Sequence, residues 1–151
     1  MTYEVISLEE KNVAGIEART NNFSPDMGAI IGGLWNSFYN EGIYENIEKK
    51  VNHKALGIYT DYDGDEKEDY TVCVACEVEK EINPSERIVI RKIPAGKYAK
   101  FIVKGDMHKA VAEFWQELWK MDLPRAFKYD LEEYQNDSMD ECEIHMYISL
   151  K

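Results

Sequence analysis

Two segments of the chain, eighty residues apart, repeat one pattern of apolar and polar positions. In each segment apolar residues recur at spacings of three and four, which is typical of an amphipathic helix with one apolar face. Before the first segment, "NNFSPD" carries helix-start signals, with Ser24 or Asp26 as N-cap and Pro25 in the first turn. Asp106 takes the N-cap place before the second segment. The predicted apolar faces are Met27, Ile30, Ile31, Leu34, Trp35 and Phe38 in the first helix, and Met107, Ala110, Val111, Phe114, Trp115 and Leu118 in the second.

The other hydrophobic segments are typical of β-strands. Alternating and β-branched residues in "YEVISLEEKNVAGIEART" (3–20) predict one strand or a bent pair. "ALGIYTDY" (55–62) and "DYTVCVACEV" (69–78) predict two strands joined by the loop "DGDEKE". Further along, "RIVIRKIPAGKYAKFIVK" (87–104) predicts two strands around a glycine turn, and "FKYDLEEYQ" (127–135) and "CEIHMYISL" (142–150) predict two more.

The order strand, helix, strand, strand therefore occurs twice, and Trp35 in the first helix matches Trp115 in the second. We interpret this as an internal duplication within a single domain of residues 1–151, with halves at about 1–80 and 81–151. Two βαββ units related by a pseudo-two-fold axis can join into one antiparallel sheet that carries two main helices. The sequence thus predicts an α+β fold with a central cleft where the halves meet, because binding sites favour interfaces between modules.

Composition and charge narrow the classes of function. The 151 residues are 44% hydrophobic and 31% charged, which is ordinary for one globular domain. A formal net charge of −11 argues against direct nucleic-acid binding, which needs clustered Lys and Arg. No apolar run reaches the ~18 residues of a membrane span, and the N-terminus lacks signal-peptide features. Three cysteines cannot all pair, which fits a reducing compartment, so we expect a cytoplasmic protein that does not act at a membrane.

The chain is rich in aromatic residues that suit the wall of a half-wet pocket. It has ten tyrosines and three tryptophans, whose rings are apolar and whose edges carry a polar group. Aromatic faces also attract cations, by about 0.5–2 kcal/mol each. For any single one of these residues a core or sheet-surface position is favoured over a pocket wall, but as a set they favour a lipophilic pocket. Those on predicted strands are Tyr59, Tyr62, Tyr70, Tyr98, Tyr134 and Tyr147.

A pair of glutamates in "DLEEYQN" supplies the polar element. On a strand, Glu132 and Tyr134 share one face, while Leu131 and Glu133 share the other. One glutamate should therefore be solvated and the other should face the interior. An inward carboxylate is costly unless a cation or hydrogen-bond donors compensate it, which makes Glu132 a candidate counter-ion for a bound cation. The alternative is an exposed glutamate on an edge strand.

The first helix contains three glycines, which are unfavourable inside helices. Gly28, Gly32 and Gly33 either leave room for a ligand or a close strand, or they mark a loosely packed helix. The three histidines (His53, His108 and His145) show no metal-ligand spacing, so neither a metal site nor a cofactor is expected.

On these residues the sequence resembles the GyrI-like, or AraC-type effector-binding, family. The resemblance covers nearly the whole chain and rests on the order of "IPAGKYAKF" (93–101), "AVAEFWQELW" (110–119), "LEEY" (131–134) and "CEIHMYI" (142–148). Leu131 replaces the phenylalanine that is usual in the family's "FEVY" element. The resemblance implies a duplicated βαββ fold whose central cleft binds lipophilic cations or amphipathic drugs, with Glu132 as the ligand-facing acid. It also implies a stand-alone module, because no DNA-binding domain such as multidrug regulators carry accompanies it.

Three functions follow as hypotheses. The first, which we favour over an enzyme, is a protein that senses or sequesters lipophilic or cationic small molecules. The second is a hydrolase of electrophilic lipophilic ring compounds, with Glu132 as general base and a tyrosine hydroxyl that polarises the leaving carbonyl. The third is a module that binds a protein partner, as the gyrase-inhibitor branch of the family suggests. The predicted ligand-binding residues are Glu132, Trp35, Tyr59, Tyr98, Trp115, Tyr134 and Tyr147.

Overall fold

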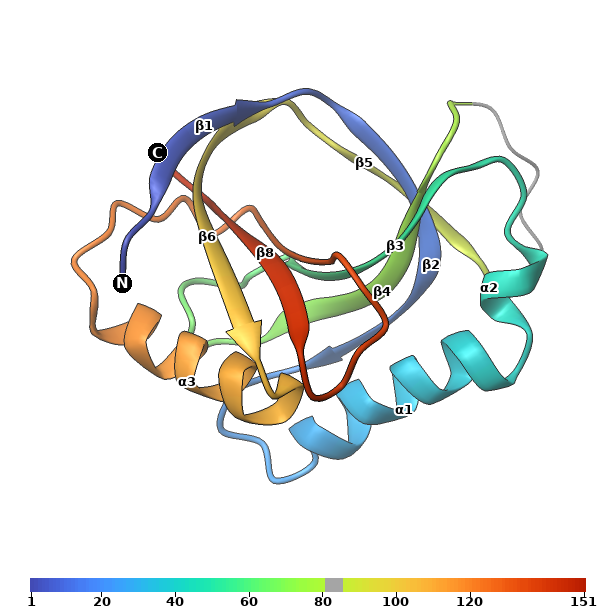
Figure 1. Cartoon of the computed structure of the whole chain (residues 1–151), viewed down its shortest axis with the longest axis horizontal. Coiled ribbons are helices and arrows are strands. Elements are labelled where there is room, and N and C mark those ends of the chain that lie inside the picture. The colour runs from blue at the N-terminus through green and yellow to red at the C-terminus, as the bar shows by residue number, and fades with distance from the viewer. Residues whose placement is uncertain (81–85) are drawn as a thin grey trace.

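A computed structural model of the chain describes residues 1–80 and 86–151 and shows eight strands and three helices in that part (Figure 1). Each strand and helix expected from the sequence is present, and the first strand segment is the bent pair β1 and β2. The short helix α2 was not expected. The elements are β1 (Glu4–Leu8), β2 (Lys11–Thr20), α1 (Met27–Asn40), α2 (Ile43–Asn46), β3 (Lys50–Thr60), β4 (Tyr70–Val78), β5 (Val89–Ile93), β6 (Gly96–Gly105), α3 (Met107–Lys120), β7 (Tyr129–Tyr134) and β8 (Cys142–Ser149).

The strands form one curved antiparallel sheet whose order reflects the duplication. The order is β1-β6-β8-β7-β3-β4-β2-β5, so each strand has its counterpart at the same distance from the β7–β3 joint. At this joint Gly57 pairs with Glu132 and Tyr59 with Asp130. The expected α+β fold of two βαββ units joined through their sheets is thereby confirmed. The expected boundary between the halves, after residue 80, falls at residues 81–85, which lie outside the described residues.

Helices α1 and α3 lie next to each other on one side of the sheet (Figure 1). The Asp106 carboxylate caps α3 by accepting a hydrogen bond from the Lys109 backbone N–H at 3.1 Å. Asp26 occupies the N-cap place of α1 but makes no such bond. Instead, the Ser24 hydroxyl oxygen accepts from the Asp26 backbone N–H at 3.2 Å. Both helices therefore begin where the sequence predicted, with different capping contacts.

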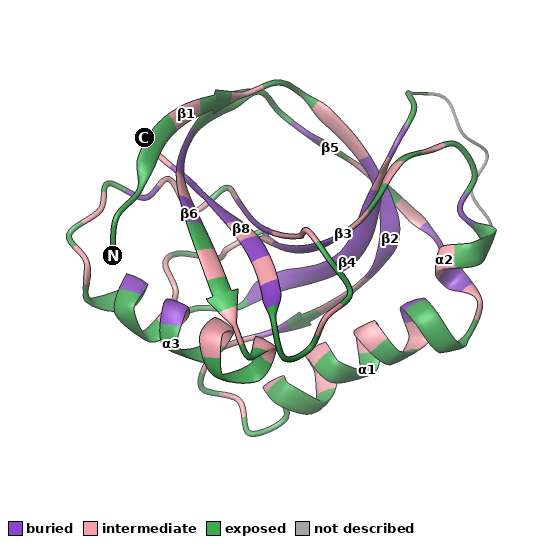
Figure 2. Ribbon diagram, viewed as in Figure 1, coloured by how far each residue is buried: buried purple, intermediate pink, exposed green. Residues whose placement is uncertain are grey.

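Apolar side chains pack on both faces of the sheet, but the helices cover their face incompletely. Phe38 and Phe114, on the second halves of α1 and α3, are buried in two separate clusters. The apolar residues in the first turns of both helices, Met27 and Met107 among them, remain only half-buried. Figure 2 shows the same contrast, with buried central strands and only short buried bands on the helices. The part of this sheet face that the helices leave uncovered lies between the first halves of α1 and α3.

Two features bear on the environment of the protein. Within the described residues, no helix is long and apolar enough to cross a membrane. Cys73, Cys76 and Cys142 are buried and none forms a disulfide. Burial raises the pKa of Cys73 to about 12 and that of Cys76 to about 11, so both thiols stay protonated and unreactive at neutral pH.

Candidate functional site: a cavity between the two helices

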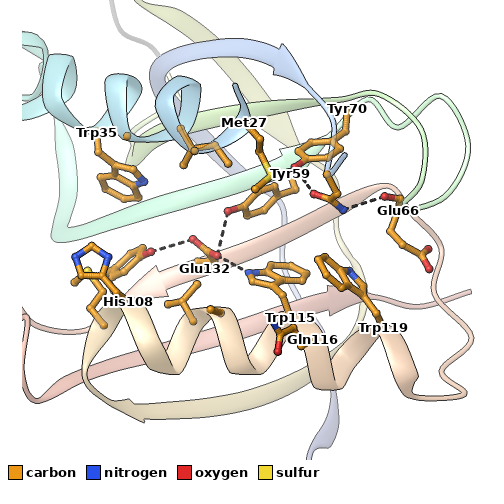
Figure 3. A pocket seen from close by; sticks show the side chains of 18 of the residues that line it. Met27, Trp35, Tyr59, Glu66, Tyr70, His108, Trp115, Gln116, Trp119 and Glu132 are labelled. Atoms are coloured by element: carbon orange, nitrogen blue, oxygen red, sulfur yellow. Dashed lines mark hydrogen bonds between the residues drawn. The ribbon is translucent and has the colours of Figure 1, made fainter. Parts of the chain in front are cut away.

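A cavity of about 610 Å³ lies between α1 and α3, above strands β3, β4 and β7 (Figure 3). This volume is in the range of pockets that hold drug-sized molecules. Equivalent positions of the two helices line it, so matched residues of the two halves form the two walls. The matched pairs are Met27 with Met107, Gly28 with His108, Ile31 with Val111, Gly32 with Ala112, and Trp35 with Trp115.

Glu132 lies on the floor of this cavity and is almost completely buried, with 2% of its surface exposed. Its Oε2 atom accepts hydrogen bonds from Trp115 Nε1 at 2.9 Å and from the Tyr59 hydroxyl at 3.2 Å. Its Oε1 atom accepts from the Tyr134 hydroxyl at 3.0 Å. Figure 3 shows the carboxylate at the centre, between Trp35 and Trp115. Of the two adjacent glutamates, Glu132 is thus the inward one, as strand alternation predicted.

The neighbouring Glu133 faces the other side of the strand. Its side chain is 13% exposed and lies 3.9 Å from Lys54 Nζ, and Gln135 Nε2 donates to it at 2.8 Å. It is therefore partly buried among polar groups rather than freely solvated, which the sequence did not predict.

The electrostatics of Glu132 combine two opposing effects. Burial raises the pKa of this carboxyl above its ordinary 4.5, and the hydrogen bonds from Trp115, Tyr134 and Tyr59 partly offset the rise. The pKa values of Tyr59 and Tyr134 are raised well above 10, first by burial and then by the adjacent carboxylate. Both hydroxyls therefore remain protonated donors. All three donors are neutral, so they orient the carboxylate without cancelling its charge.

Gly57 gives the carboxylate its place. A Cβ atom at this position would lie 2.6 Å from Glu132 Oε1 and 3.5 Å from Trp35 Cζ2, so only glycine allows the observed approach. Gly57 was not among the residues predicted from the sequence. The available signal was a glycine inside a predicted strand, which often marks close approach of another group.

Aromatic side chains form the walls around Glu132. The Trp35 and Tyr134 rings meet edge to face with centroids 5.1 Å apart, and Tyr59 and Trp115 do the same at 5.2 Å. The two tryptophans are equivalent in sequence but differ in their contacts, because Trp115 alone of the two donates to Glu132. The structure thus brings together five of the seven residues predicted to bind ligand: Trp35, Tyr59, Trp115, Glu132 and Tyr134.

The structure does not bring the other two predicted residues, Tyr98 and Tyr147, to this cavity. They are buried on the opposite face of the sheet, in a cluster with Leu131, and line neither this cavity nor its neighbour. The reason is strand register. Leu131 pairs with Tyr147, and cross-strand partners share a face, so Tyr147 lies on the side away from Glu132. Tyr98 contacts Tyr147 there, with ring centroids 6.5 Å apart.

The helix glycines leave open space at the cavity. Gly28 and Gly32 line it, and a Cβ atom at either position would meet no atom within 4 Å. Gly33 is equally open but lines neither cavity. Of the two interpretations of these glycines, room beside the helix is the one that the geometry at Gly28 and Gly32 favours.

Further lining residues were not in the predicted set. The Tyr70 hydroxyl donates to Asn22 Oδ1 at 2.6 Å, and the Tyr62 hydroxyl donates to Asp130 Oδ2 at 2.6 Å. Arg125 also lines the cavity and pairs with Asp130. The tyrosines stood out in the sequence as strand aromatics, whereas Arg125 comes from a segment without regular structure and gave no signal.

A second cavity of about 800 Å³ adjoins the first along the helices. The two share Gly32, Trp35, Met107, His108 and Tyr134, so they are neighbouring parts of one cleft. The residues that line only the second include Asn52, Lys54 and Gln135. Among the described residues, no group of three or more His, Cys, Asp or Glu side chains could hold a metal ion.

Comparison with known proteins adds a family and a set of similar folds. The family described as integron-associated effector binding protein (Cass2) matches residues 4–150. An integron cassette protein of Vibrio cholerae is 29% identical, with 97% of this chain and 95% of that chain covered and a TM-score of 0.75. No curated protein matches the chain.

Two further solved structures are less similar in sequence and show the fold. SAV2435 bound to tetraphenylphosphonium is 20% identical, covers 99% of this chain and 94% of its own, and has a TM-score of 0.76. A putative transcription regulation protein of Staphylococcus aureus is 19% identical, covers 99% of both chains, and has a TM-score of 0.74.

Proposed function

Because the chain belongs to the integron-associated effector-binding protein family, and is thus a small-molecule-binding protein, we propose that its ligand is a lipophilic cation. The ligand occupies the cavity between α1 and α3, where Glu132 is its counter-ion. Trp35, Tyr59, Trp115 and Tyr134 provide the aromatic walls.

One observation carries this proposal: a buried carboxylate has only neutral hydrogen-bond partners. Trp115, Tyr59 and Tyr134 orient Glu132, yet the charge itself stays uncompensated. Removing a charge from water is costly unless an opposite charge is near, so a cation that enters the cavity gains more there than a neutral molecule of the same shape. The tetraphenylphosphonium bound to the similarly folded SAV2435, itself a lipophilic cation, supports the same class of ligand.

The aromatic walls add attraction of the same sign. Ring faces attract cations, by about 0.5–2 kcal/mol per ring when the cation is desolvated. Large apolar cations lose little hydration on entering such a cavity, whereas small hydrated cations lose much. The arrangement therefore selects for bulky, delocalised or substituted cations rather than for metal ions or ammonium.

The proposal is tested by titrating the protein with tetraphenylphosphonium and with neutral triphenylphosphine oxide. Quenching of tryptophan fluorescence reports binding, because Trp35 and Trp115 line the cavity. Glu132→Gln should weaken the cation at least tenfold, on the order of one lost buried charge pair, and change the neutral compound little. Glu133→Gln is the matched control, since it removes the same charge from the adjacent residue on the other face. Equal weakening of both compounds by Glu132→Gln would contradict a counter-ion role.

The same mixtures separate binding from catalysis. Mass spectrometry should recover every ligand unchanged, including cyclopropane-containing natural products added to the panel. A product heavier by one water, formed by the wild type and not by Glu132→Gln, would replace this proposal with the hydrolase hypothesis.

A further inference from the structure

The second cavity, of about 800 Å³, begins within one side chain of Glu132. Tyr134, whose hydroxyl donates to Glu132 Oε1 at 3.0 Å, lines both cavities. Trp35 and His108 also line both, and Figure 3 shows them at the same end of the first cavity. At Gly32, a further shared residue, a Cβ atom would meet nothing within 4 Å, so α1 places no side chain there. A substituent on a cation at Glu132 can therefore extend from the first cavity into the second.

Large apolar side chains line the second cavity without being covered by the protein. Tyr39 is 47% exposed and Met139 is 49% exposed, and both line only this cavity. The Tyr39 ring stacks on Trp35, with centroids 6.2 Å apart and planes 19° apart, so it continues the aromatic wall of the first cavity. Ala55 and Met107 add further apolar lining. Exposed apolar groups that gather around a concave surface are typical of a ligand-binding site.

The amide side chains of this cavity are held by the protein itself. Asn136 Nδ2 donates to the Glu141 backbone oxygen at 3.2 Å, and its Oδ1 accepts from the Glu143 backbone N–H at 3.4 Å. Gln135 Nε2 donates to the Glu133 backbone oxygen at 2.9 Å and to its carboxylate at 2.8 Å. These contacts use the hydrogen-bonding groups that would otherwise favour a polar ligand, and leave apolar contact as the main interaction on offer.

The charges around the second cavity favour a neutral occupant. Its two charged residues, Lys54 and Asp137, have opposite signs. Lys54 Nζ also lies 3.9 Å from a Glu133 carboxylate oxygen. The lysine disfavours a second cation here, whereas the two carboxylates disfavour an anion. Neither sign of charge gains what a cation gains beside Glu132.

We propose that the second cavity binds an apolar tail of the same cation whose charged head lies at Glu132. The inference rests on the proposed function and specifies its ligand class further: amphiphilic cations with a charged, bulky head and an unbranched apolar tail. The tail passes beside Trp35 and Tyr134 and lies against Tyr39 and Met139. Each methylene group that is buried there should increase affinity about fourfold.

The test compares methyltriphenylphosphonium with hexyltriphenylphosphonium by tryptophan fluorescence, because Trp35 lines both cavities. The wild-type protein should bind the hexyl probe about 100-fold more tightly, as expected when part of the added chain is buried. Analogues whose tail ends in a carboxylate or an ammonium group should lose most of this gain. Equal affinity for the methyl and hexyl probes, or tighter binding of a charged tail than of hexyl, would overturn this inference and leave the cation proposal intact. Failure of every probe to bind would overturn the proposed function and this inference with it.

Three variants assign the gain to the second cavity. Asn52→Phe places a ring in that cavity alone, so it should reduce the hexyl gain to less than about tenfold and leave the methyl probe unaffected. Val51→Phe is the matched control, because it adds the same ring at an exposed neighbour that lines neither cavity.

Met139→Ser removes one uncovered apolar contact outside the helices and strands, and should reduce the hexyl gain about threefold without disturbing the fold. A gain of wild-type size in both Asn52→Phe and Met139→Ser would place the tail elsewhere and refute the inference. A loss in Val51→Phe as large as that in Asn52→Phe would do the same.

Discussion

Two buried carboxylates on one face of strand β7 are compensated in different ways. Asp130, with no exposed surface, is paired with the Arg125 guanidinium and accepts further bonds from Tyr62 and Ser149. Glu132, two residues along, accepts three hydrogen bonds from neutral groups only. The protein supplies a counter-charge for the first carboxylate and leaves the second without one.

This difference fits the two roles that we propose, a structural charge at Asp130 and a ligand-binding charge at Glu132. A buried ion pair with good hydrogen bonds holds the elements that carry it together. Removing one partner leaves the other charge buried and unpaired. A carboxylate that has hydrogen-bond donors but no cation is positioned equally well, yet its negative charge remains available to a bound cation. The three donors on Glu132 thus preorganise the site, whereas the guanidinium at Asp130 removes that position as a cation site.

The largest expected effect is a difference in folding stability between variants of Asp130 and of Glu132. Asp130→Asn leaves the Arg125 charge buried without its partner, and should lower the free energy of unfolding by about 3 kcal/mol. Glu132→Gln removes a charge that has no partner to strand, and should change stability by no more than about 1 kcal/mol. Urea denaturation followed by tryptophan fluorescence measures both. A Glu132→Gln variant destabilised as strongly as Asp130→Asn would show that the two carboxylates have the same role.

The second effect is a pH dependence that belongs to Glu132. Burial raises its pKa above the ordinary 4.5, so the folded protein keeps this proton at pH values where the unfolded chain has lost it. Its contribution to stability is therefore present below the unfolded pKa and is lost as the pH rises through the folded pKa. Cation binding needs the carboxylate, so affinity should increase with pH over the same window, by at most about tenfold per unit.

Titrations of tetraphenylphosphonium at a series of pH values from the ordinary carboxyl pKa to neutrality measure this dependence. Glu132→Gln provides the control, because an amide does not titrate, and its weaker affinity should not vary across the window. An increase in wild-type affinity that persists unchanged in the variant would assign the titration to another group.

A third effect is expected at Gly57, which allows the Glu132 carboxylate to occupy its observed position. In Gly57→Ala the new Cβ would lie 2.6 Å from Glu132 Oε1, and three hydrogen bonds resist its displacement. We expect a loss of about tenfold in cation affinity and of about 1–2 kcal/mol in stability. Gly33→Ala is the matched control: it faces open space on α1, away from both cavities, and should stabilise the helix by about 0.5–1 kcal/mol. Unchanged affinity in Gly57→Ala would mean that the carboxylate position is not critical.

Periodicity predicted much of this arrangement. The repeated apolar pattern located both helices and paired Trp35 with Trp115, and alternation in "DLEEYQ" placed Glu132 and Tyr134 on one face. These are local properties, because the side-chain period of a helix or strand depends only on its own residues. The palindromic order of the strands likewise follows from two copies of one unit meeting at equivalent edges.

The features that escaped prediction depend on relations between distant segments. Which face a tyrosine of β6 or β8 occupies is set by its register against neighbouring strands, and a shift of one residue reverses it. Arg125 reaches the cavity from an irregular segment, held by Asp130 and Phe127, and no periodicity describes such a position. Gly57 matters only because Glu132 lies opposite it on another strand.

The smallest expected effect tests the assignment of faces directly. Tyr134→Phe and Tyr147→Phe each remove one hydroxyl from a tyrosine near the centre of the sheet. Tyr134 donates to Glu132 Oε1 at 3.0 Å, so its loss leaves the carboxylate less firmly held and less readily ionised. Cation affinity should then decrease about fivefold, the effect of about 1 kcal/mol. Tyr147 lies beside Leu131 on the opposite face, and its substitution should leave affinity unchanged. Fluorescence titrations of both variants under one condition make the comparison, and equal weakening by the two would mean that the ligand does not contact the face that bears Glu132.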